Sequence, residues 1–447
     1  MHSNLKSQTI TNPHVNIFWF RRDLRLEDNA GLYQALKDGL PVIPIFIFDR
    51  YILDKLEEKN DRRVSFIYSA VEELQRSLMT LGSSLLVYHG FPEKIFEDLL
   101  VGYKISKVFT NHDYEPYAIE RDSRINELLK NSDISLVSYK DQVIFDKNEV
   151  IKDDGRPYTV FTPYSKRWKS KLNDHYLKEY PNSLHYDNFY KQPALQLPSL
   201  HSLGFLQKEY VFPSKLLDQD LISKYSKQRD FPGKNGTSKI GVHLRFGTVS
   251  VRVLASRAQQ LNETYLNELI WRDFYQMILW HFQKVGKGHA FKQEYEMIQW
   301  RNDEKEFELW CEGKTGYPLV DAGMRELNAT GFMHNRVRMV VASFLCKHLL
   351  IDWRWGEAYF ANKLLDFDLA SNNGGWQWAS GSGCDAAPYF RIFNPYLQTK
   401  KFDPELNYVN TWVPELNEFT YPPPIVEHEF ARKRCLEVYG KALKRNL

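Results

Sequence analysis

The first third of the chain alternates short, apolar, β-rich runs with stretches in which apolar residues recur every three or four positions. The runs are continuously apolar, which is typical of strands buried on both faces of a parallel sheet. The helical stretches between them would cover both faces of that sheet. The pattern predicts a doubly wound α/β domain over residues 14–138, with strands at 15–20, 42–48, 84–88, 107–110 and 134–138.

The loop after the first of these strands limits what this Rossmann-like domain can bind. Dinucleotide-binding domains carry glycines here, so that a pyrophosphate can approach the start of the next helix. Residues 21–29 read RRDLRLEDN and contain no glycine. We therefore expect no dinucleotide site in this domain, and the mixed charges favour ion pairs that fix the loop.

The rest of the chain divides into a connector and a second domain. Over residues 139–235 the periodicity weakens, which predicts a connector packed across the surface, with short helices near 164–176 and 213–225. Over residues 236–447 the helical period returns without strand signals and predicts an all-helical domain. Nine of the 11 tryptophans lie in this domain, whose expected helices include 265–285, 318–330, 335–350 and 355–365.

Composition limits the partners and the compartment. The formal net charge of +3 excludes a basic coat over the whole chain, so nucleic acid would have to bind a local patch. Residues 1–14 lack the apolar core of a signal peptide, and no apolar run approaches the ~20 residues that cross a bilayer. We expect a cytoplasmic protein, away from membranes and without a metal site or a disulfide framework, because four cysteines lie far apart: Cys311, Cys346, Cys384 and Cys435.

One helical stretch, 268–275, carries polar and aromatic side chains on a single face. Glu268, Trp271, Arg272 and Tyr275 follow helical spacing, so a carboxylate, an indole, a guanidinium and a phenol lie together. Solvent-facing helix surfaces rarely combine these groups. Two interpretations stay open: the face lines a polar cavity, or it belongs to a core with one internal ion pair.

A second stretch, 331–339, opens another helix, on which Asn335, Arg338 and Met339 share a face. His334 has no second His or Cys at ligand spacing, which favours a structural or hydrogen-bonding histidine over a metal ligand. The hydroxyl- and glycine-rich segment 236–241 precedes a further helix. Its backbone amides suit a phosphate, with an ordinary helix cap as the default interpretation.

Residues 366–378 read DFDLASNNGGWQW, an unfavourable helix interior because acids, amides and two glycines follow one another. A turn with a helix cap would explain Asp368 and Gly374. It does not explain the neighbouring Trp376 and Trp378. The amides and acids could instead satisfy a polar ring system, which the glycines would let the backbone approach.

In these motifs the chain resembles the photolyase/cryptochrome family, and most closely its class I cyclobutane pyrimidine dimer photolyases. The resemblance covers essentially the whole chain, from residues 18–25 (FWFRRDLR) through 229–232 (RDFP) to 425–428 (IVEH). It implies an N-terminal α/β domain and a C-terminal helical domain that holds FAD, reduced as FADH⁻, in a U shape.

The resemblance assigns roles to two sets of residues. Arg338 would pair with Asp366 beside the flavin ring, and Asn372 would face its N5 atom. The residues implied for FAD are Tyr225, Thr237, Ser238, Lys239, Ile240, Gly241, Arg338, Asp366, Phe367, Asp368 and Asn372. Those implied for the flipped-out dimer and its DNA strand are Glu268, Trp271, Arg272, Asn335, Arg336, Met339, Trp378 and Gln398.

The implied reaction is light-dependent repair of UV-damaged DNA. Excited FADH⁻ passes one electron to the dimer, the cyclobutane bonds break, and the electron returns. Glu268 would stabilise the dimer radical anion by donating a hydrogen bond or proton, with desolvation raising its pKa, while Asn335 would hydrogen-bond the thymine edges. The family's flavin-reducing tryptophans match Trp376, Trp353 and Trp300, in order from flavin to surface.

Related activities remain as alternatives. A (6-4) photolyase relies on a histidine facing the lesion, where this chain has Asn335 after His334. A cryptochrome, a blue-light sensor without repair, often carries a long C-terminal tail, and a single-strand-restricted cryptochrome-DASH type is opposed by residues 373–378 (NGGWQW). These comparisons favour repair of cyclobutane dimers by a monomer.

Relatives also commonly bind an antenna pigment, either methenyltetrahydrofolate or a deazaflavin. Asn111 and Glu115 could line a folate cleft in or beside the α/β domain. The match is loose, so the identity of the pigment stays open.

Overall fold

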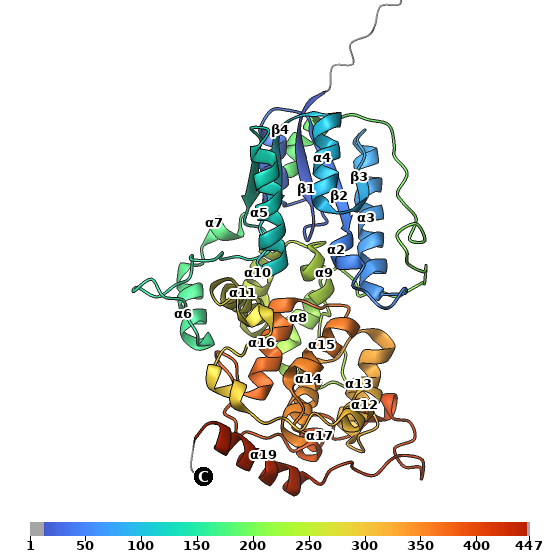
Figure 1. Cartoon of the computed structure of the whole chain (residues 1–447), viewed down its shortest axis with the longest axis vertical. Coiled ribbons are helices and arrows are strands. Elements are labelled where there is room, and N and C mark those ends of the chain that lie inside the picture. Colours follow the sequence, from blue (N-terminus) through green and yellow to red (C-terminus); the bar gives the residue numbers. More distant parts are fainter. Residues whose placement is uncertain (1–12, 445–447) are drawn as a thin grey trace, which may run out of the picture.

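The computed structural model describes residues 13–444, which form a sheet domain above a larger helical domain (Figure 1). The five strands are all parallel, in the order β3-β2-β1-β4-β5. The order reverses between β1 and β4, so the predicted doubly wound topology is confirmed. Every expected strand is present: β1 (His14–Phe20), β2 (Val42–Asp49), β3 (Leu86–Gly90), β4 (Lys104–Asn111) and β5 (Ser135–Tyr139).

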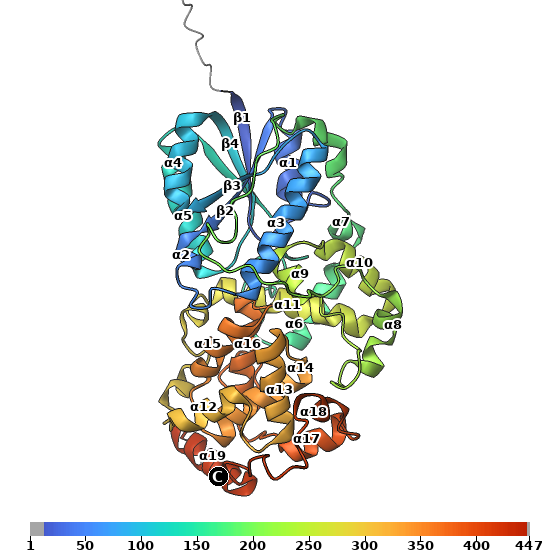
Figure 2. The same cartoon turned by 90° about the vertical axis from the view of Figure 1, so that its right-hand side faces the viewer.

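Helices cover both faces of the sheet (Figure 2). One face carries α1 (Ala30–Lys37) and α3 (Arg62–Thr80), and the other carries α4 (Pro92–Gly102) and α5 (Pro116–Lys130); the short α2 (Arg50–Leu53) follows β2. Because successive side chains of a strand point to opposite faces, β1 supplies two separate apolar cores. Phe18 and Phe20 join one core, and Ile17 and Trp19 join the other.

The connector packs across both domains, as expected of a segment of this length (Figures 1 and 2). The Trp168 indole, for example, donates a 2.9 Å hydrogen bond to Asp273 of the helical domain. Two of its helices, α7 and α8, begin where a side chain caps them rather than where the periodicity placed them, since Asn173 and Asp218 each accept amide hydrogen bonds. They are α6 (Phe161–Lys171), α7 (Asp174–Leu177), the 3₁₀ turn η1 (Asn182–Asn188) and α8 (Gln219–Gln228).

The helical domain contains no strand among its described residues. The helix expected over 335–350 is interrupted, because it continues after Ser343 as a π turn. None of the helices within residues 13–444 is both long and apolar enough to cross a membrane. The elements are α9 (Gly241–Phe246), α10 (Val251–Leu261), α11 (Glu263–His281), η2 (Val285–Lys287), η3 (Gln293–Met297), α12 (Glu304–Glu312), α13 (Pro318–Thr330), α14 (Asn335–Ser343), η4 (Phe344–His348), α15 (Trp353–Lys363), α16 (Leu369–Ser380), α17 (Pro395–Phe402), α18 (Asn407–Trp412) and α19 (His428–Ala442).

The expectation that residues 366–378 avoid helix is wrong, since α16 begins at Leu369. Asp368 caps this helix by accepting a 3.1 Å hydrogen bond from the Ser371 amide. Gly374 is needed for packing, because a Cβ there would lie 2.3 Å from a ring carbon of Tyr275. Close packing of α16 on α11 therefore outweighs the low helix propensity of the segment.

The glycine-free loop after β1 forms the contact between the domains, and the predicted ion pairs are present. Arg22 pairs with Asp113 at 3.1 Å and Glu115 at 2.9 Å, both after β4. It also pairs with Asp368 of the helical domain at 2.7 Å. These groups occupy the switch point between β1 and β4, where other doubly wound domains bind ligands.

A second ion-pair cluster lies behind the first. Asp141 accepts hydrogen bonds from Arg25 at 2.7 Å and from Arg252 of α10 at 2.8 Å. Arg252 also donates to Asp28 of the loop at 2.8 Å. The domain contact is thus made of buried, paired charges rather than of apolar side chains alone.

Candidate active site

A cavity of about 450 Å³ opens in the helical domain between α9, α11, α14, α15 and α16. It gathers twelve of the residues that the resemblance implied for FAD or DNA, together with Trp376 of the implied reduction chain. They are Gly241, Glu268, Trp271, Arg272, Asn335, Arg338, Met339, Asp366, Phe367, Asp368, Asn372, Trp376 and Trp378.

The polar and aromatic face of α11 lines this cavity, which decides between the two interpretations left open by its spacing. Glu268, Trp271, Arg272 and Tyr275 all border the cavity. The opposite face of α11 is buried among apolar side chains of the connector and of α10. The helix therefore carries a core on one side and a binding surface on the other.

Glu268 contacts a guanidinium that sequence reasoning missed. Arg229, directly after α8, donates to the Glu268 carboxylate and also borders the cavity. Burial raises the pKa of Glu268 above its ordinary value, although Arg229 opposes the shift, and Asp230 adds a smaller contribution. The carboxyl group can therefore take up a proton more readily than an exposed glutamate.

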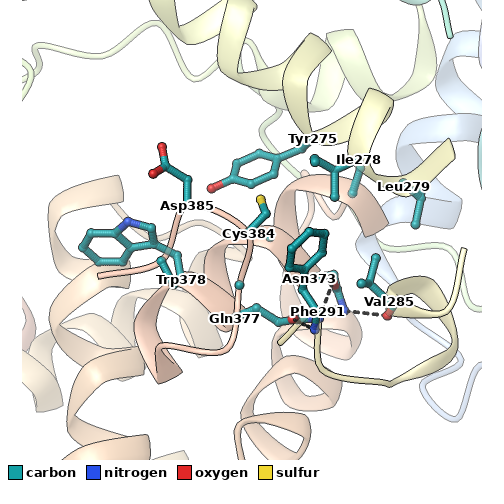
Figure 3. A pocket seen from close by; sticks show the side chains of 14 residues that line it. Tyr275, Ile278, Leu279, Val285, Phe291, Asn373, Gln377, Trp378, Cys384 and Asp385 are labelled. Atoms are coloured by element: carbon teal, nitrogen blue, oxygen red, sulfur yellow. Dashed lines mark hydrogen bonds between the residues drawn. The ribbon is translucent and has the colours of Figure 1, made fainter. Parts of the chain in front are cut away.

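The two indoles expected to stack on the lesion, Trp271 from α11 and Trp378 from α16, both border the cavity. The Trp378 ring lies 6.4 Å from Phe393, tilted by 32°. Figure 3 shows Trp378 at the edge of an adjoining apolar pocket, beside Asp385, with Tyr275 pointing toward that carboxylate. Flat ring surfaces thus face the cavity from two helices.

The predicted pair of Arg338 and Asp366 is confirmed. Nη2 of Arg338 donates to both carboxylate oxygens, at 3.1 and 3.0 Å, and its Nε donates to the Met333 carbonyl at 2.7 Å. Gly241, at the start of α9, lies against the same carboxylate, because a Cβ there would be 3.0 Å from Oδ2 of Asp366. The pair is therefore fixed in position from α14 and α9.

Asp368 is a fixed negative charge at the N-terminus of α16. Burial favours its neutral form, but the guanidinium groups of Arg22, Arg245 and Arg272 hold the pKa of Asp368 well below its usual range. Gln276 of α11 donates to the same carboxylate at 3.1 Å. The carboxylate thereby joins the sheet domain, α11 and α16 at the cavity wall.

Asn372 lies one turn further along α16, and its Nδ2 donates to the Glu357 carbonyl of α15 at 3.2 Å. The adjacent Asn373 donates to the Glu357 carboxylate at 2.8 Å. Burial raises the pKa of Glu357 to about 7, with Asn373 and Arg354 opposing the shift. A carboxyl group able to hold a proton at neutral pH therefore stands behind Asn372.

The structure does not support the expectation that Arg272 meets the DNA strand. Its guanidinium is buried and donates to the carbonyls of Gln142 and Leu244. It therefore belongs to the inner wall of the cavity and is not free to reach a strand outside. Arg336 is half-buried and pairs with Asp230 at 2.7 Å, and Gln398 is likewise half-buried on α17.

Five residues expected to hold FAD flank the cavity without lining it: Tyr225, Thr237, Ser238, Lys239 and Ile240. Ser238 and Tyr265 share a 2.9 Å hydrogen bond between their hydroxyls, and the Tyr225 ring lies 5.0 Å from that of Tyr265. Lys239 has a left-handed backbone (φ +51°) in the loop that leads to α9. The cap interpretation is wrong in one respect, since no side chain of this segment caps α9.

The three tryptophans of the implied reduction chain contact one apolar cluster. Trp376 lines the cavity and is buried, Trp353 on α15 is buried, and Trp300 is half-buried. Gly356 of α15 makes room for the Trp376 ring, because a Cβ at this position would lie 2.0 Å from Cη2 of Trp376. Trp300 is therefore the most exposed of the three, as predicted for the surface end, whereas Trp376 and Trp353 are equally buried.

His334 is a hydrogen-bonding histidine, as predicted. Its Nδ1 accepts from the Arg336 amide at 3.2 Å and caps α14, and burial together with Arg338 lowers the pKa of His334 to about 4. Among residues 13–444, no group of three or more His, Cys, Asp or Glu is arranged to hold a metal.

Asn111 does not offer a free side chain to an antenna pigment. Its Nδ2 donates to Asp23 at 2.6 Å and Asn29 at 2.8 Å, and its Oδ1 accepts from the Gly31 amide at 2.9 Å. The side chain is saturated in holding the loop after β1. The suggestion that Asn111 lines a folate cleft is therefore corrected.

Several cavity residues were not singled out from the sequence. Arg229 lies in the RDFP segment that carried part of the resemblance, but no spacing links it to Glu268. Ser371 and Gly375 lie in the 366–378 motif without having been given a role of their own, and nothing in the local pattern pointed to Leu244, Arg245, Ala342, Phe360 and Leu364.

Comparison with known proteins decides the family. Residues 16–183 match the family model "DNA photolyase", and residues 265–420 match "FAD binding domain of DNA photolyase". The deoxyribodipyrimidine photo-lyase of Synechococcus is 36% identical, with 95% of this chain and 96% of the relative covered. The chain belongs to the DNA photolyase family.

Solved structures agree with this assignment. A class III photolyase from Agrobacterium tumefaciens is 33% identical, covers 99% of this chain and 100% of its own, and superimposes with a TM-score of 0.85. A Synechocystis cryptochrome is 26% identical, covers 96% and 99%, and superimposes with a TM-score of 0.82. The predicted two-domain architecture is confirmed, and the finer assignment to class I stays a prediction.

The cavity fits FAD, the cofactor that the family model names. Its walls combine apolar side chains such as Phe360 and Leu364 with amides and carboxylates suited to a polar ring. At Gly375 an added Cβ would meet nothing within 4 Å, so the backbone of α16 is open to close approach by a flat ligand. Four guanidinium groups also border the cavity, each held by a carboxylate or by backbone carbonyls: Arg229, Arg245, Arg272 and Arg338.

Proposed function

We propose that this protein repairs UV-damaged DNA by splitting cyclobutane pyrimidine dimers with light, using FAD as FADH⁻. One observation carries the proposal: a single cavity combines amides and carboxylates suited to a flavin ring with the indoles of Trp271 and Trp378 and a carboxyl group of raised pKa. A flavin and an extruded base in this cavity would be in contact. Members of the family with matching length, such as the Synechococcus protein, are deoxyribodipyrimidine photo-lyases.

When bound, FAD supplies the electron that opens the dimer, and the chain supplies binding and orientation. Arg338 and Asp366 would hold the ring from one side, with Phe367 packing against it and Asn372 near N5. Asp368 would keep a negative charge at the wall. The flanking residues Tyr225, Thr237, Ser238, Lys239, Ile240 and Gly241 would hold the ribityl chain and phosphates.

The mouth of the cavity would take the lesion. A dimer has to leave the stack before its atoms can be reached, and a damaged pair lowers the unstacking cost. Trp271 and Trp378 would stack on it, and stacking of this kind is worth ~1–3 kcal/mol per base. Glu268 and Asn335 would hydrogen-bond the thymine edges with Met339 packed beside them, and Arg336 and Gln398 would meet the strand.

Trp376, Trp353 and Trp300 would pass electrons inward to reduce the flavin. Trp376→Phe should abolish light-driven flavin reduction and spare repair by protein that was chemically reduced beforehand. Trp310→Phe is a matched control, because this indole is equally buried and lies 6.1 Å from Trp376 outside the proposed chain. Normal photoreduction in Trp376→Phe would remove the assignment.

The neighbouring activities differ from this one at particular residues. Asn335 borders the cavity, whereas His334 is turned inward as a helix cap, which favours cyclobutane dimers over (6-4) products. The fold is shared with a cryptochrome and so does not separate a sensor from a repair enzyme. The complete set of lesion-facing residues favours repair.

A direct assay tests the function. Purified protein is mixed with UV-irradiated oligo-thymidine and illuminated, and the recovery of ultraviolet absorbance is followed as bases regain their 5,6 double bonds. Recovery in light and none in darkness is expected. Separate cyclobutane and (6-4) substrates distinguish the two repair reactions, and no turnover on either would support a sensor.

Two further features belong to the proposal. A reducing compartment, the cytoplasm, is supported by four free thiols, and the function needs only one chain per cavity. Size-exclusion chromatography should therefore give a monomer. An antenna pigment, whether methenyltetrahydrofolate or a deazaflavin, stays a prediction.

A further inference from the structure

Trp271 has one ring face left for a ligand, because Phe161 covers the other. The two rings are parallel, with centroids 3.7 Å apart and 3° between their planes. The other aromatic neighbours, Phe274 at 5.7 Å edge-on and Tyr275 at 5.4 Å tilted by 33°, do not lie parallel to the indole. A base that stacks on Trp271 must therefore use the face opposite Phe161.

Phe161 comes from the connector, where it is the first residue of α6. The N-cap residue Val160 provides no side-chain hydrogen bond, so the first amide of this helix lacks a local partner. The Phe161 amide donates instead to the Asp385 carboxylate at 3.0 Å. A carboxylate at a helix N-terminus is also favoured by the helix dipole.

Asp385 lies in the loop that follows α16, the helix that carries Trp378. Figure 3 shows the Asp385 carboxylate beside Trp378, on the side toward Tyr275. The hydrogen bond between Phe161 and Asp385 thus connects the ring behind Trp271 to the loop that follows the helix of Trp378. Three segments far apart in the sequence meet here: the start of α6, the middle of α11 and the end of α16.

We propose that Phe161 and Asp385 are positioning residues that fix the plane of Trp271 and tie it to the Trp378 wall. The two indoles then present a preformed slot, and a lesion binds without first having to order a loose side chain. This inference rests on the proposed function, and it adds residues that do not touch the flavin or the substrate.

Dark binding measures the effect apart from catalysis. Fluorescence anisotropy compares an oligonucleotide carrying one cyclobutane dimer with the same undamaged oligonucleotide. Phe161→Leu keeps apolar volume but removes the flat face, and should weaken binding of the damaged strand about 5-fold while leaving the undamaged strand unchanged. Phe161→Tyr keeps the ring and should bind like the wild type.

Asp385→Ala keeps the ring stack but removes its tether, and should weaken lesion binding about 2- to 3-fold. Phe307→Leu is the matched control, because Phe307 is also half-buried and stacks on a tryptophan, Trp310, at 5.6 Å and 17° in the core. It should lower thermal stability without changing the preference for damaged DNA. FAD content and near-ultraviolet circular dichroism are recorded for each variant.

The outcomes separate the two claims. A wild-type protein without preference for the dimer overturns the proposed function and this inference with it. A wild type that prefers the dimer, beside a Phe161→Leu variant of equal preference and normal FAD content, overturns the positioning role alone. If Phe161→Leu fails to retain FAD, Asp385→Ala decides, and equal preference there overturns the role.

Discussion

Carboxyl groups in the ion pairs of the domain contact, of which Asp368 also borders the cavity, and two carboxyl groups on α11 and α15 respond to burial in opposite ways. Asp141 and Asp368 are buried, but two or three guanidinium groups surround each, and the pKa of each lies below its ordinary value. Glu268 has one guanidinium partner, and Glu357 accepts only from an amide. Burial raises the pKa of both, for Glu357 to about 7.

The difference shows that the number of guanidinium neighbours, more than depth, decides whether a carboxyl group keeps its charge. At the domain contact the carboxyl groups stay ionised, which suits ion pairs that hold the two domains together permanently. At Glu268, which borders the cavity, burial outweighs the single guanidinium partner and raises the pKa, which suits a group that shares or donates a proton during chemistry.

The largest change in the free energy of unfolding should follow from removing a charge from the ion pairs of the domain contact. Asp141→Asn would leave Arg25 buried without a carboxylate partner, although Arg252 keeps Asp28, and loss of one partner of a buried ion pair costs about 3–5 kcal/mol. Urea unfolding at neutral pH should show this loss. Glu115→Gln is the control, since Arg22 and Arg245 keep Asp113 or Asp368 as partners. A loss below about 1 kcal/mol in Asp141→Asn would contradict the comparison.

Glu357 is a carboxyl group whose pKa is raised by burial, and the dependence of unfolding on pH tests this. Its folded pKa of about 7 exceeds the ordinary 4.5, so the folded state holds a proton that the unfolded state releases. Stability is therefore lost as pH rises from about 4.5 to about 7. Glu357→Gln keeps the acceptor for Asn373 and should be more stable than the wild type by about 2 kcal/mol at pH 8, with no gain near pH 4.

Unfolding of both proteins across this range measures the difference. The groups that face Glu357, namely Asn373, Arg354 and Asp352, are unchanged in the variant. A gain that is the same at both ends of the range would mean that packing, and not the proton, causes it.

The sequence predicted the elements whose cause is local and missed the contacts whose cause is tertiary. The parallel sheet follows from continuous apolar runs, and α13 has its predicted bounds because Pro318 starts it and Gly331 (φ +74°) ends it. α16 was missed, since its stability comes from Asp368 and from packing on Tyr275 rather than from propensity.

The site shows the same division. The α11 face could be read from helical spacing, and the Arg338–Asp366 pair followed only from the resemblance. Arg229 and Phe161 escaped both approaches, because each belongs to the connector, whose periodicity is weak, and reaches the cavity wall through the fold alone.

Glu268 should affect repair more than stability. Its side chain is one-third exposed, so loss of its ion pair with Arg229 should change unfolding by under about 1 kcal/mol. Glu268→Ala removes the proposed hydrogen bond to the dimer radical anion and should lower the repair quantum yield about 3- to 10-fold. Glu268→Gln, which retains a donor, should recover part of it. An unchanged yield in Glu268→Ala would show that this carboxyl group has no such role.

Arg336 should give the smallest effect, because its charge lies at the accessible rim. Its guanidinium pairs with Asp230 at 2.7 Å, and both side chains are partly exposed. Arg336→Gln should weaken damaged and undamaged DNA alike by about 2- to 5-fold and reduce the salt dependence of log Kd by about one phosphate contact.

Arg124→Gln in the sheet domain is the matched control for this variant, since its guanidinium forms a similar exposed pair with Glu93 at 2.6 Å. Titrations at several salt concentrations should show a lower slope for Arg336→Gln and an unchanged slope for Arg124→Gln. Equal slopes in both variants would mean that the strand does not cross the rim at α14. In that case the guanidinium groups of the cavity wall, rather than those of the rim, would have to supply the affinity for DNA.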